Sequence, residues 1–567
     1  MSEKRAEFSF RTRQRSLERF AREEFDLLII GGGITGAAVA RDATMRGLKV
    51  ALVEKHDFAY GTSSRSSKLI HGGLRYLQNM EFGLVFEALS ERALLLKTAP
   101  HLVKPLPFFF PVYRGDKNGK KLLSLGFWLY DLLSLFRAPG FHQNLSKSAL
   151  LEQIPFLKTA GLEGGFKYFD ASMWDDVLAI EILRDASEKG AAVANYVEAL
   201  DPLWEGEVLR GFRVKDAEVA QALPISLRAK KVISCTGPWT DHVGKVLSKQ
   251  WKNWIAPSKG VHLIFDLKRI PIPGAMVMSS PEDGRISFVI PRPDFGAGVV
   301  IVGTTDGPSP KNPEIGTVEP EDVDYLLGLL NKYFPKLALT ASDILSAYVG
   351  VRPLMGQEKG QRSGSPLQKV SREHHIAEGP GGSVFVAGGK YTTHRKMAEE
   401  IVDFAIATSV GKNELKPTAP SSTKAPVNPA VLPEQIASAQ SKATELGLSV
   451  PAELFERYGA EALEVLDLKD TKDPKDPEAF PALGAQLRFS MRNEMTMHIE
   501  DFYIRRNPFY ASRADHGLPW AKDLAKIWAS EREASGMELA GEITRLENEI
   551  QSRTAWQTTA YVKKAGP

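Results

Sequence analysis

The chain has 567 residues, of which 43% are hydrophobic, so it exceeds one typical core and is expected to form two or three globular domains. Its net charge of +3 is too small to indicate a nucleic-acid partner, and its single cysteine, Cys235, excludes an internal disulfide framework. Cys235 stands in an apolar run, which favours a buried structural thiol in a reducing compartment over a nucleophile.

No apolar run is long enough to span a bilayer, and the N-terminus lacks the pattern of a signal peptide. Residues 1–24 form a basic lead, which we expect to be a solvated amphipathic helix.

A glycine-rich turn follows the first predicted strand. Residues 27–30 are a short apolar run suited to a buried parallel strand, and Gly31, Gly33 and Gly36 come directly after it. In a G-x-G-x-x-G turn the first glycine allows the tight bend, the second lets a pyrophosphate approach, and the third lets helix pack on strand. The helix predicted over 34–46 would direct its N-terminal N–H groups at the phosphates.

An acidic residue completes this unit. The second predicted strand covers 49–53 and is followed by Glu54, where a carboxylate accepts hydrogen bonds from ribose hydroxyls and repels a 2′-phosphate. NADP is therefore disfavoured, whereas NAD and FAD both remain compatible with the motif. We find no second glycine fingerprint for a separate nicotinamide nucleotide, and this favours FAD.

A loop at 60–76 is dense in hydroxyl groups and glycine. Its small residues permit the backbone to approach a flat ring, while Lys68, His71, Arg75 and Tyr76 bring hydrogen-bond donors to one place. Functional residues concentrate in such loops, so we expect this one to contact the cofactor or the substrate.

Seven segments together resemble the FAD-dependent glycerol-3-phosphate dehydrogenase family, and they occur in that family's order. They are GGGITGAAVARDA, TSSRSSKLIHGGLRYL, CTGPWT, SKGVHLIF, FVIPRPDFGAGVVIVGTTD, YVGVRPL and AGGKYTTHRKMAEE. The resemblance covers about 25–407 and implies an α/β fold shared with D-amino-acid and glycine oxidases. An FAD-binding Rossmann-type domain would carry an antiparallel-sheet substrate domain, followed by a C-terminal α-helical domain.

The expected domain limits follow from the resemblance and from composition. The FAD-binding parts are 25–110, 190–253 and 350–410, the substrate-domain parts are 111–189 and 254–349, a Pro/Ser/Thr-rich linker is 411–433, and the helical domain is 434–567. Short strands separated by Pro/Gly turns across the second substrate part indicate an antiparallel sheet.

The resemblance also implies a set of cofactor-binding residues. They are Gly31, Gly33, Gly36, Glu54, Ser63, Ser64, Ser67, Lys68, His71, Gly72, Gly73, Thr236, Gly237, Gly388, Gly389, Lys390, Thr392 and Thr393. The last five form a second glycine turn before a helix, whose N-terminus can stabilise the negative charge of a reduced flavin. No metal site is expected.

Oxidation of a secondary alcohol by a flavin requires a base for the hydroxyl proton and donors for the developing negative charge. His262 is the candidate base, with His71 as the rival, and Arg352 is the candidate donor for the hydroxyl oxygen. An imidazole base would make flavin reduction faster as pH rises through 6 to 8.

The family's substrate ends in a phosphate dianion, which favours several cations rather than one arginine. Arg75, Tyr76, Arg372 and Lys390 are the expected substrate-binding residues, with Lys390 shared between substrate and flavin. The implied reaction converts sn-glycerol 3-phosphate to dihydroxyacetone phosphate and passes electrons to a membrane quinone. Oxygen as the acceptor, an amino-acid oxidase and a non-catalytic flavoprotein are the alternatives.

The apolar stretch 120–137 has basic ends and carries Phe127, Trp128 and Tyr130. A buried helix and a helix lying in a membrane interface are both compatible with this pattern. The quinone partner implied by the resemblance favours peripheral attachment to the cytoplasmic face of the membrane. A homodimer is also compatible with the sequence.

Overall fold

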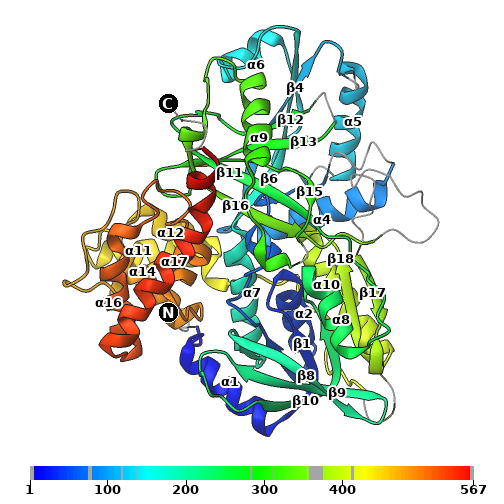
Figure 1. The fold of residues 1–567 in the computed structure, drawn as a ribbon. Coiled ribbons are helices and arrows are strands. Elements are labelled where there is room, and N and C mark those ends of the chain that lie inside the picture. The colour runs from blue at the N-terminus through cyan, green and yellow to red at the C-terminus, as the bar shows by residue number, and fades with distance from the viewer. Residues whose placement is uncertain are drawn as a thin grey trace.

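The computed structural model describes residues 5–73, 80–116, 119–135, 137–280, 284–310, 312–356, 374–409, 411 and 414–561. Figure 1 shows three regions: a first sheet with its helices below, a second sheet above, and a group of C-terminal helices along one side of both. The expected α/β fold with a C-terminal helical domain is confirmed.

The first sheet has the parallel centre expected of a dinucleotide-binding domain. Its main strand order is β17-β18-β10-β1-β2-β7, and β8 and β9 extend it from β10. The strands are β1 (Glu24–Ile30), β2 (Val50–Val53), β7 (Ala192–Ala194), β8 (Val197–Glu205), β9 (Val208–Asp216), β10 (Ile225–Ser234), β17 (His374–Glu378) and β18 (Val384–Gly388). β1 pairs in parallel with β2 and β10, and β10 pairs in parallel with β18. Because these central strands are parallel, their carboxyl ends meet at one edge, where ligands bind in such sheets.

Helices from distant parts of the chain pack against this sheet. They are α2 (Ile34–Met45), α7 (Asp175–Glu188), α8 (Thr240–Leu247) and α10 (His394–Ala407). α7 belongs to an expected substrate-domain part, yet it packs against α2, as does α10. By this packing α7 belongs with the FAD-binding domain, so the domain boundary expected between residues 189 and 190 should lie before α7.

The N-terminal helix α1 (Phe10–Arg22) corrects the expectation of a solvated helix. Leu17 and Phe20 are buried against the first sheet, and α1 contacts β7 and β10. Arg13, which is also buried, forms an ion pair with Asp216. Arg13 thus helps to hold the helix to the domain, because a buried guanidinium needs a carboxylate partner.

The second sheet is mainly antiparallel, as the Pro/Gly-punctuated strands predict. Its main order is β15-β11-β14-β13-β12-β4-β6-β3, with β16 added to β11 and β5 to β6. Its strands are β3 (Leu69–Ile70), β4 (Val103–Tyr113), β5 (Gln143–Leu145), β6 (Leu162–Met173), β11 (Ser258–Asp266), β12 (Ala275–Ser279), β13 (Ile286–Arg292), β14 (Val299–Gly303), β15 (Gly307–Pro308) and β16 (Ile344–Arg352). The expected boundary at 110/111 falls inside β4. α4 (Phe82–Thr98), α5 (Lys120–Leu133), α6 (Lys147–Gln153) and α9 (Pro320–Tyr333) complete this region.

Helix α5 combines the two alternatives that the sequence left open. Phe127 and Tyr130 are buried against the second sheet, whereas Leu122, Leu125 and Trp128 are 60%, 66% and 61% exposed. Phe127 and Tyr130 therefore follow the buried-helix alternative. Across the residues that the structure describes, none of the helices has both the length and the apolar character needed to cross a bilayer.

The C-terminal helices follow a segment that is attached to α2. Arg41 of α2 donates hydrogen bonds to the carbonyl oxygens of Thr423, Ala425 and Pro426, so much of the expected linker is held in place. The helices are α11 (Pro433–Glu445), α12 (Ala452–Tyr458), α13 (Ala462–Asp467), α14 (Leu483–Asn493), α15 (Ile499–Asp501), α16 (Ala521–Arg532) and α17 (Gly536–Tyr561). They dock through Arg505 and Arg506, which both bind the buried carboxylate of Asp57.

Candidate active site

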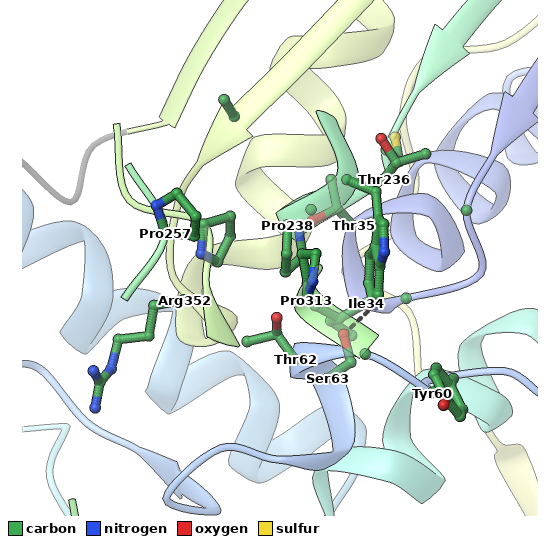
Figure 2. Close-up of a pocket in the computed structure, with 18 of the residues that line it drawn as sticks. Ile34, Thr35, Tyr60, Thr62, Ser63, Thr236, Pro238, Pro257, Pro313 and Arg352 are labelled. Carbon is green, nitrogen blue, oxygen red and sulfur yellow. Dashed lines mark hydrogen bonds between the residues drawn. The ribbon is translucent and has the colours of Figure 1, made fainter. Parts of the chain in front are cut away.

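A cavity of about 950 Å³ opens at the carboxyl ends of the parallel strands and reaches the second sheet. Figure 2 shows Ile34, Ser63 and Thr236 on one side of it and Arg352 on another. The ends of β1, β2, β10 and β18 contribute one wall, and β11 and β16 contribute the other. This is the switch-point position at which open α/β sheets bind dinucleotides.

The first turn has the backbone geometry that its glycines predict. Gly31 has a φ of +107°, and a Cβ there would lie 2.6 Å from the carbonyl oxygen of Cys235. At Gly36 a Cβ would lie 1.9 Å from the carbonyl oxygen of Gly31, so only glycine lets α2 pack this closely on β1. Gly33 caps α2 at the cavity, and the next N–H, that of Ile34, donates to Ser63 Oγ at 2.9 Å.

Glu54 lies at the end of β2, as predicted, and lines the cavity. Its Oε2 accepts from the Gly32 N–H at 2.7 Å, and its Oε1 accepts from the His56 N–H at 2.9 Å. Burial raises the pKa of Glu54, while these two backbone hydrogen bonds oppose the rise. The carboxylate is thus held rigidly at the turn, with lone pairs left to accept further hydrogen bonds.

His262 is buried on β11, and its ring is stacked on that of Tyr348 with centroids 4.7 Å apart. Its Nε2 lies 2.9 Å from Ser67 Oγ, while its Nδ1 has no hydrogen-bond partner among the described residues. Burial lowers the pKa of His262 to about 3, with Arg352 and Lys68 acting in the same direction. This shift favours the neutral imidazole and runs against the expected titration between pH 6 and 8.

Arg352 ends β16 directly opposite Ser258 at the start of β11. Its guanidinium donates to Thr304 Oγ1 at 2.8 Å and to Ser258 Oγ at 3.2 Å, and it also pairs with Asp306. Gly260 makes room for it, because a Cβ there would lie 2.4 Å from Arg352 Nη2. Arg352 is a fixed cation beside the neutral imidazole, and both line the cavity.

Two loops meet on the remaining side of the cavity. Thr392 Oγ1 is 3.4 Å from both the backbone N and the backbone O of His71, so the loop after β3 is joined to the loop after β18. Gly388 and Gly389 have φ values of +74° and +92°, which turn the chain toward Lys390 and the start of α10. His71, Lys390 and Thr392 all line the cavity.

Comparisons with known proteins identify the family. The profile described as FAD dependent oxidoreductase matches residues 26–395, and that of the C-terminal domain of alpha-glycerophosphate oxidase matches 430–538. The chain is 34% identical over 517 residues to the aerobic glycerol-3-phosphate dehydrogenase of Staphylococcus saprophyticus, covering 89% of this chain and 91% of that one. This chain belongs to the FAD-dependent glycerol-3-phosphate dehydrogenase family. The Staphylococcus aureus enzyme of the same name is 39% identical over 382 residues, or 67% of each chain.

A solved relative supports the same assignment. The structure of the glycerol-3-phosphate dehydrogenase from Bacillus halodurans complexed with FAD superposes with a TM-score of 0.77 at 29% identity. It covers 96% of this chain and 98% of that one. FAD is the cofactor of this family member, and the cavity has the features that FAD requires. The turn at Gly31 and Gly33 would leave room for a pyrophosphate, and Glu54 follows β2, the position from which an acidic residue would bind a ribose in this fold.

The cavity brings together most of the cofactor-binding and catalytic residues predicted for this family member. Those that line it are Gly31, Gly33, Glu54, Ser63, Ser67, His71, Thr236, Gly237, His262, Arg352, Gly388, Gly389, Lys390 and Thr392. Arg75, Tyr76 and Arg372 lie outside the described residues.

Six predicted cofactor residues are not part of the cavity lining, namely Gly36, Ser64, Lys68, Gly72, Gly73 and Thr393. Gly36 serves the packing of α2 on β1, as expected for the third glycine of the motif. Lys68 is buried and forms ion pairs with Asp175 and Asp176, so its ammonium is engaged away from the cavity. A lysine within a functional loop was taken as a donor to the cofactor, but a buried ammonium needs carboxylates and finds them at the start of α7.

Other lining residues were missed by the sequence analysis. Tyr60, Thr62 and Arg65 border the predicted loop residues, and their position within that motif was a usable signal. Glu314, in the 3-10 helix Pro313–Ile315, contacts His56 and Lys55, which are more than 250 residues away in the chain, and all three line the cavity. Nothing local in the sequence indicates that contact, because it arises only when the two sheets come together.

Proposed function

We propose that the protein oxidises sn-glycerol 3-phosphate to dihydroxyacetone phosphate and transfers the electrons to a membrane quinone. Bound FAD would supply hydride acceptance at the flavin ring. The curated relatives named aerobic glycerol-3-phosphate dehydrogenase support the substrate, and the observation that carries the chemistry is the pairing of neutral His262 with Arg352 in one cavity. A neutral imidazole can accept a proton, and a guanidinium beside it can stabilise the oxygen that loses that proton.

In this proposal His262 accepts the hydroxyl proton and Arg352 stabilises the substrate oxygen. His262 Nε2 would take the hydroxyl proton once the substrate hydroxyl has replaced Ser67 Oγ, which lies 2.9 Å from that nitrogen. Arg352 would donate a hydrogen bond to the substrate oxygen, since hydrogen bonds to Thr304 and Ser258 already hold its guanidinium in place. Because burial favours the neutral imidazole, in which one ring nitrogen carries a proton and the other has a free lone pair, no prior deprotonation is needed.

Recognition of the phosphate would come from cations at the opposite end of the substrate. Lys390 is at the cavity, next to the glycine turn that follows β18. Arg75 and Arg372 are the further cations that we propose for this role, and Tyr76 would add a hydroxyl donor. A dianion favours such a cluster, whereas a carboxylate substrate would need only one bidentate arginine.

Anaerobic mixing with glycerol 3-phosphate tests the proposal. Bleaching of the flavin reports the first half-reaction, and its recovery after oxygen or a soluble quinone is admitted reports the second. We expect rapid bleaching and rapid recovery with quinone. Rapid recovery with oxygen alone would make the protein an oxidase, and failure to bleach would reject glycerol 3-phosphate as the substrate.

We further propose that the outer face of α5 attaches the protein to the membrane. Leu122, Leu125, Trp128 and Leu132 of this face are more than half exposed. Lys121 and Arg137 at its ends are also exposed and can contact anionic headgroups. An apolar helix face of this kind with basic ends is suited to lie in a bilayer interface.

Replacing Leu125 and Trp128 with serine should release the protein from anionic lipid vesicles. Both side chains are exposed, so the fold and the activity with a soluble dye should remain intact. Co-sedimentation with vesicles measures the effect. Phe127→Ser is the matched control, because Phe127 is buried and its loss should lower the unfolding temperature. A double-serine variant that still sediments with vesicles would reject this attachment site.

A further inference from the structure

A buried polar cluster lies behind the loop that follows β3. Arg92 of α4, Tyr130 of α5 and Asp170 of β6 are each no more than 2% exposed. The Tyr130 hydroxyl lies 2.9 Å from both carboxylate oxygens of Asp170, and Arg92 forms an ion pair with the same carboxylate. Burial, reinforced by Asp170, raises the pKa of Tyr130. Its hydroxyl therefore stays protonated and donates a hydrogen bond to the carboxylate of Asp170.

The same hydroxyl oxygen also accepts a hydrogen bond from the loop that follows β3. The backbone N–H of Gly72 donates to Tyr130 Oη at 3.0 Å, and Asp170 Oδ1 is 3.4 Å from the same nitrogen. Gly72 permits this approach, because a Cβ there would lie 2.5 Å from Tyr130 Oη and 2.4 Å from Leu89 Cδ2. Close packing against Tyr130 and Leu89 therefore explains the glycine at position 72, because Gly72 does not line the cavity.

The neighbouring residue is fixed from the opposite side. His71 lines the cavity, and its backbone N and O both contact Thr392 Oγ1 of the loop after β18. Consecutive residues of one loop are thus held by two different elements, Thr392 at His71 and Tyr130 at Gly72.

We propose that Tyr130 is a positioning residue for substrate binding, which it sets through the hydrogen bond from Gly72. Asp170 and Arg92 keep the hydroxyl oriented, so that it always presents a lone pair to the loop. Tyr130 does not line the cavity, so its hydroxyl acts only by fixing the backbone of Gly72 and thereby of His71, which does line it. This inference rests on the proposed function, which has the substrate bound in the cavity that His71 lines.

Tyr130→Phe keeps the ring and removes only the hydroxyl. A displaced loop weakens a contact that substrate and transition state share, so KM for glycerol 3-phosphate should rise about threefold to tenfold, the equivalent of one net hydrogen bond. The limiting rate of flavin reduction and the flavin content should stay close to those of the wild type. Steady-state kinetics, anaerobic stopped-flow reduction and flavin absorbance measure the three quantities.

Tyr168→Phe is the matched control. Tyr168 is buried in the same aromatic cluster, 6.0 Å from Tyr130 between ring centroids, and within the described residues its hydroxyl makes no hydrogen bond to Gly72. An unchanged KM in Tyr130→Phe, an equal rise in both variants, or loss of flavin from Tyr130→Phe would overturn the inference while leaving the proposed function intact. Failure of the wild type to be reduced by glycerol 3-phosphate would reject both together.

Discussion

Replacing His262 with alanine is expected to slow reduction of the flavin by glycerol 3-phosphate about 100-fold to 10,000-fold, which is the usual contribution of a positioned base. The substrate should still bind, because its phosphate contacts are at the other end. Flavin content should also be retained, since the backbone of β11 is fixed by pairing with β14 and β16. Anaerobic stopped-flow measurement of reduction at saturating substrate provides the test.

The pH dependence should differ from that of an ordinary histidine base. Burial lowers the pKa of His262 to about 3, so the base is already neutral at pH 6 and remains so at pH 8. The limiting reduction rate should therefore be nearly constant over this range and fall only as pH approaches about 3. KM can still change near pH 6, because a phosphate monoester takes up its second proton there.

His71→Ala is the comparison that separates the two candidate bases. Both imidazoles line the cavity, but His262 is the one hydrogen-bonded to Ser67 and placed beside Arg352. His262→Asn gives a second test in which a polar side chain is kept and the basic nitrogen is lost. If His262→Ala reduces its flavin at the wild-type rate while His71→Ala does not, the assignment must be reversed.

The sequence allowed the nucleotide-binding half of the site to be predicted because its determinants are local. Gly31, Gly36 and Glu54 lie within one strand-turn-helix-strand unit, where spacing alone sets the geometry. His262 and Arg352 were also predicted, but through motifs of a family rather than through spacing. Their placement at one cavity depends on pairing between β11 and β16, whose residues are about 90 positions apart.

The errors arose where burial overrides local chemistry. Lys68 was expected to contact the cofactor, but it is committed to Asp175 and Asp176, which are more than 100 residues away. The pKa of His262 was set at the ordinary imidazole value, because a sequence does not report how fully a side chain is desolvated. The basic residues of α1 were taken as solvated, although Arg13 is buried against Asp216. Each correction depends on a partner that local patterning does not reveal.

The glycines of the first turn should give two different failures when replaced. Gly33→Leu should yield a folded protein without FAD, because the new side chain would occupy the pyrophosphate position. The backbone at Gly33 has a φ of −78° and a ψ of −177°, which any residue can adopt, and the nearest atom to a Cβ there is Ser63 Oγ at 3.0 Å. Flavin absorbance relative to protein absorbance measures the loss.

Gly36→Ala should instead destabilise the fold, even though the added group is only a methyl. Its Cβ would lie 1.9 Å from the carbonyl oxygen of Gly31, so α2 must move away from β1. Alanine gains up to about 1 kcal/mol of helix propensity over glycine, but overpacking costs about 1 to 3 kcal/mol or more, so the clash decides the sign. Thermal unfolding of the two FAD-free proteins separates the variants: without the stabilising effect of bound FAD, Gly36→Ala should unfold at a lower temperature than Gly33→Leu. A Gly33→Leu protein that keeps its full flavin content would contradict the placement of the pyrophosphate at this turn.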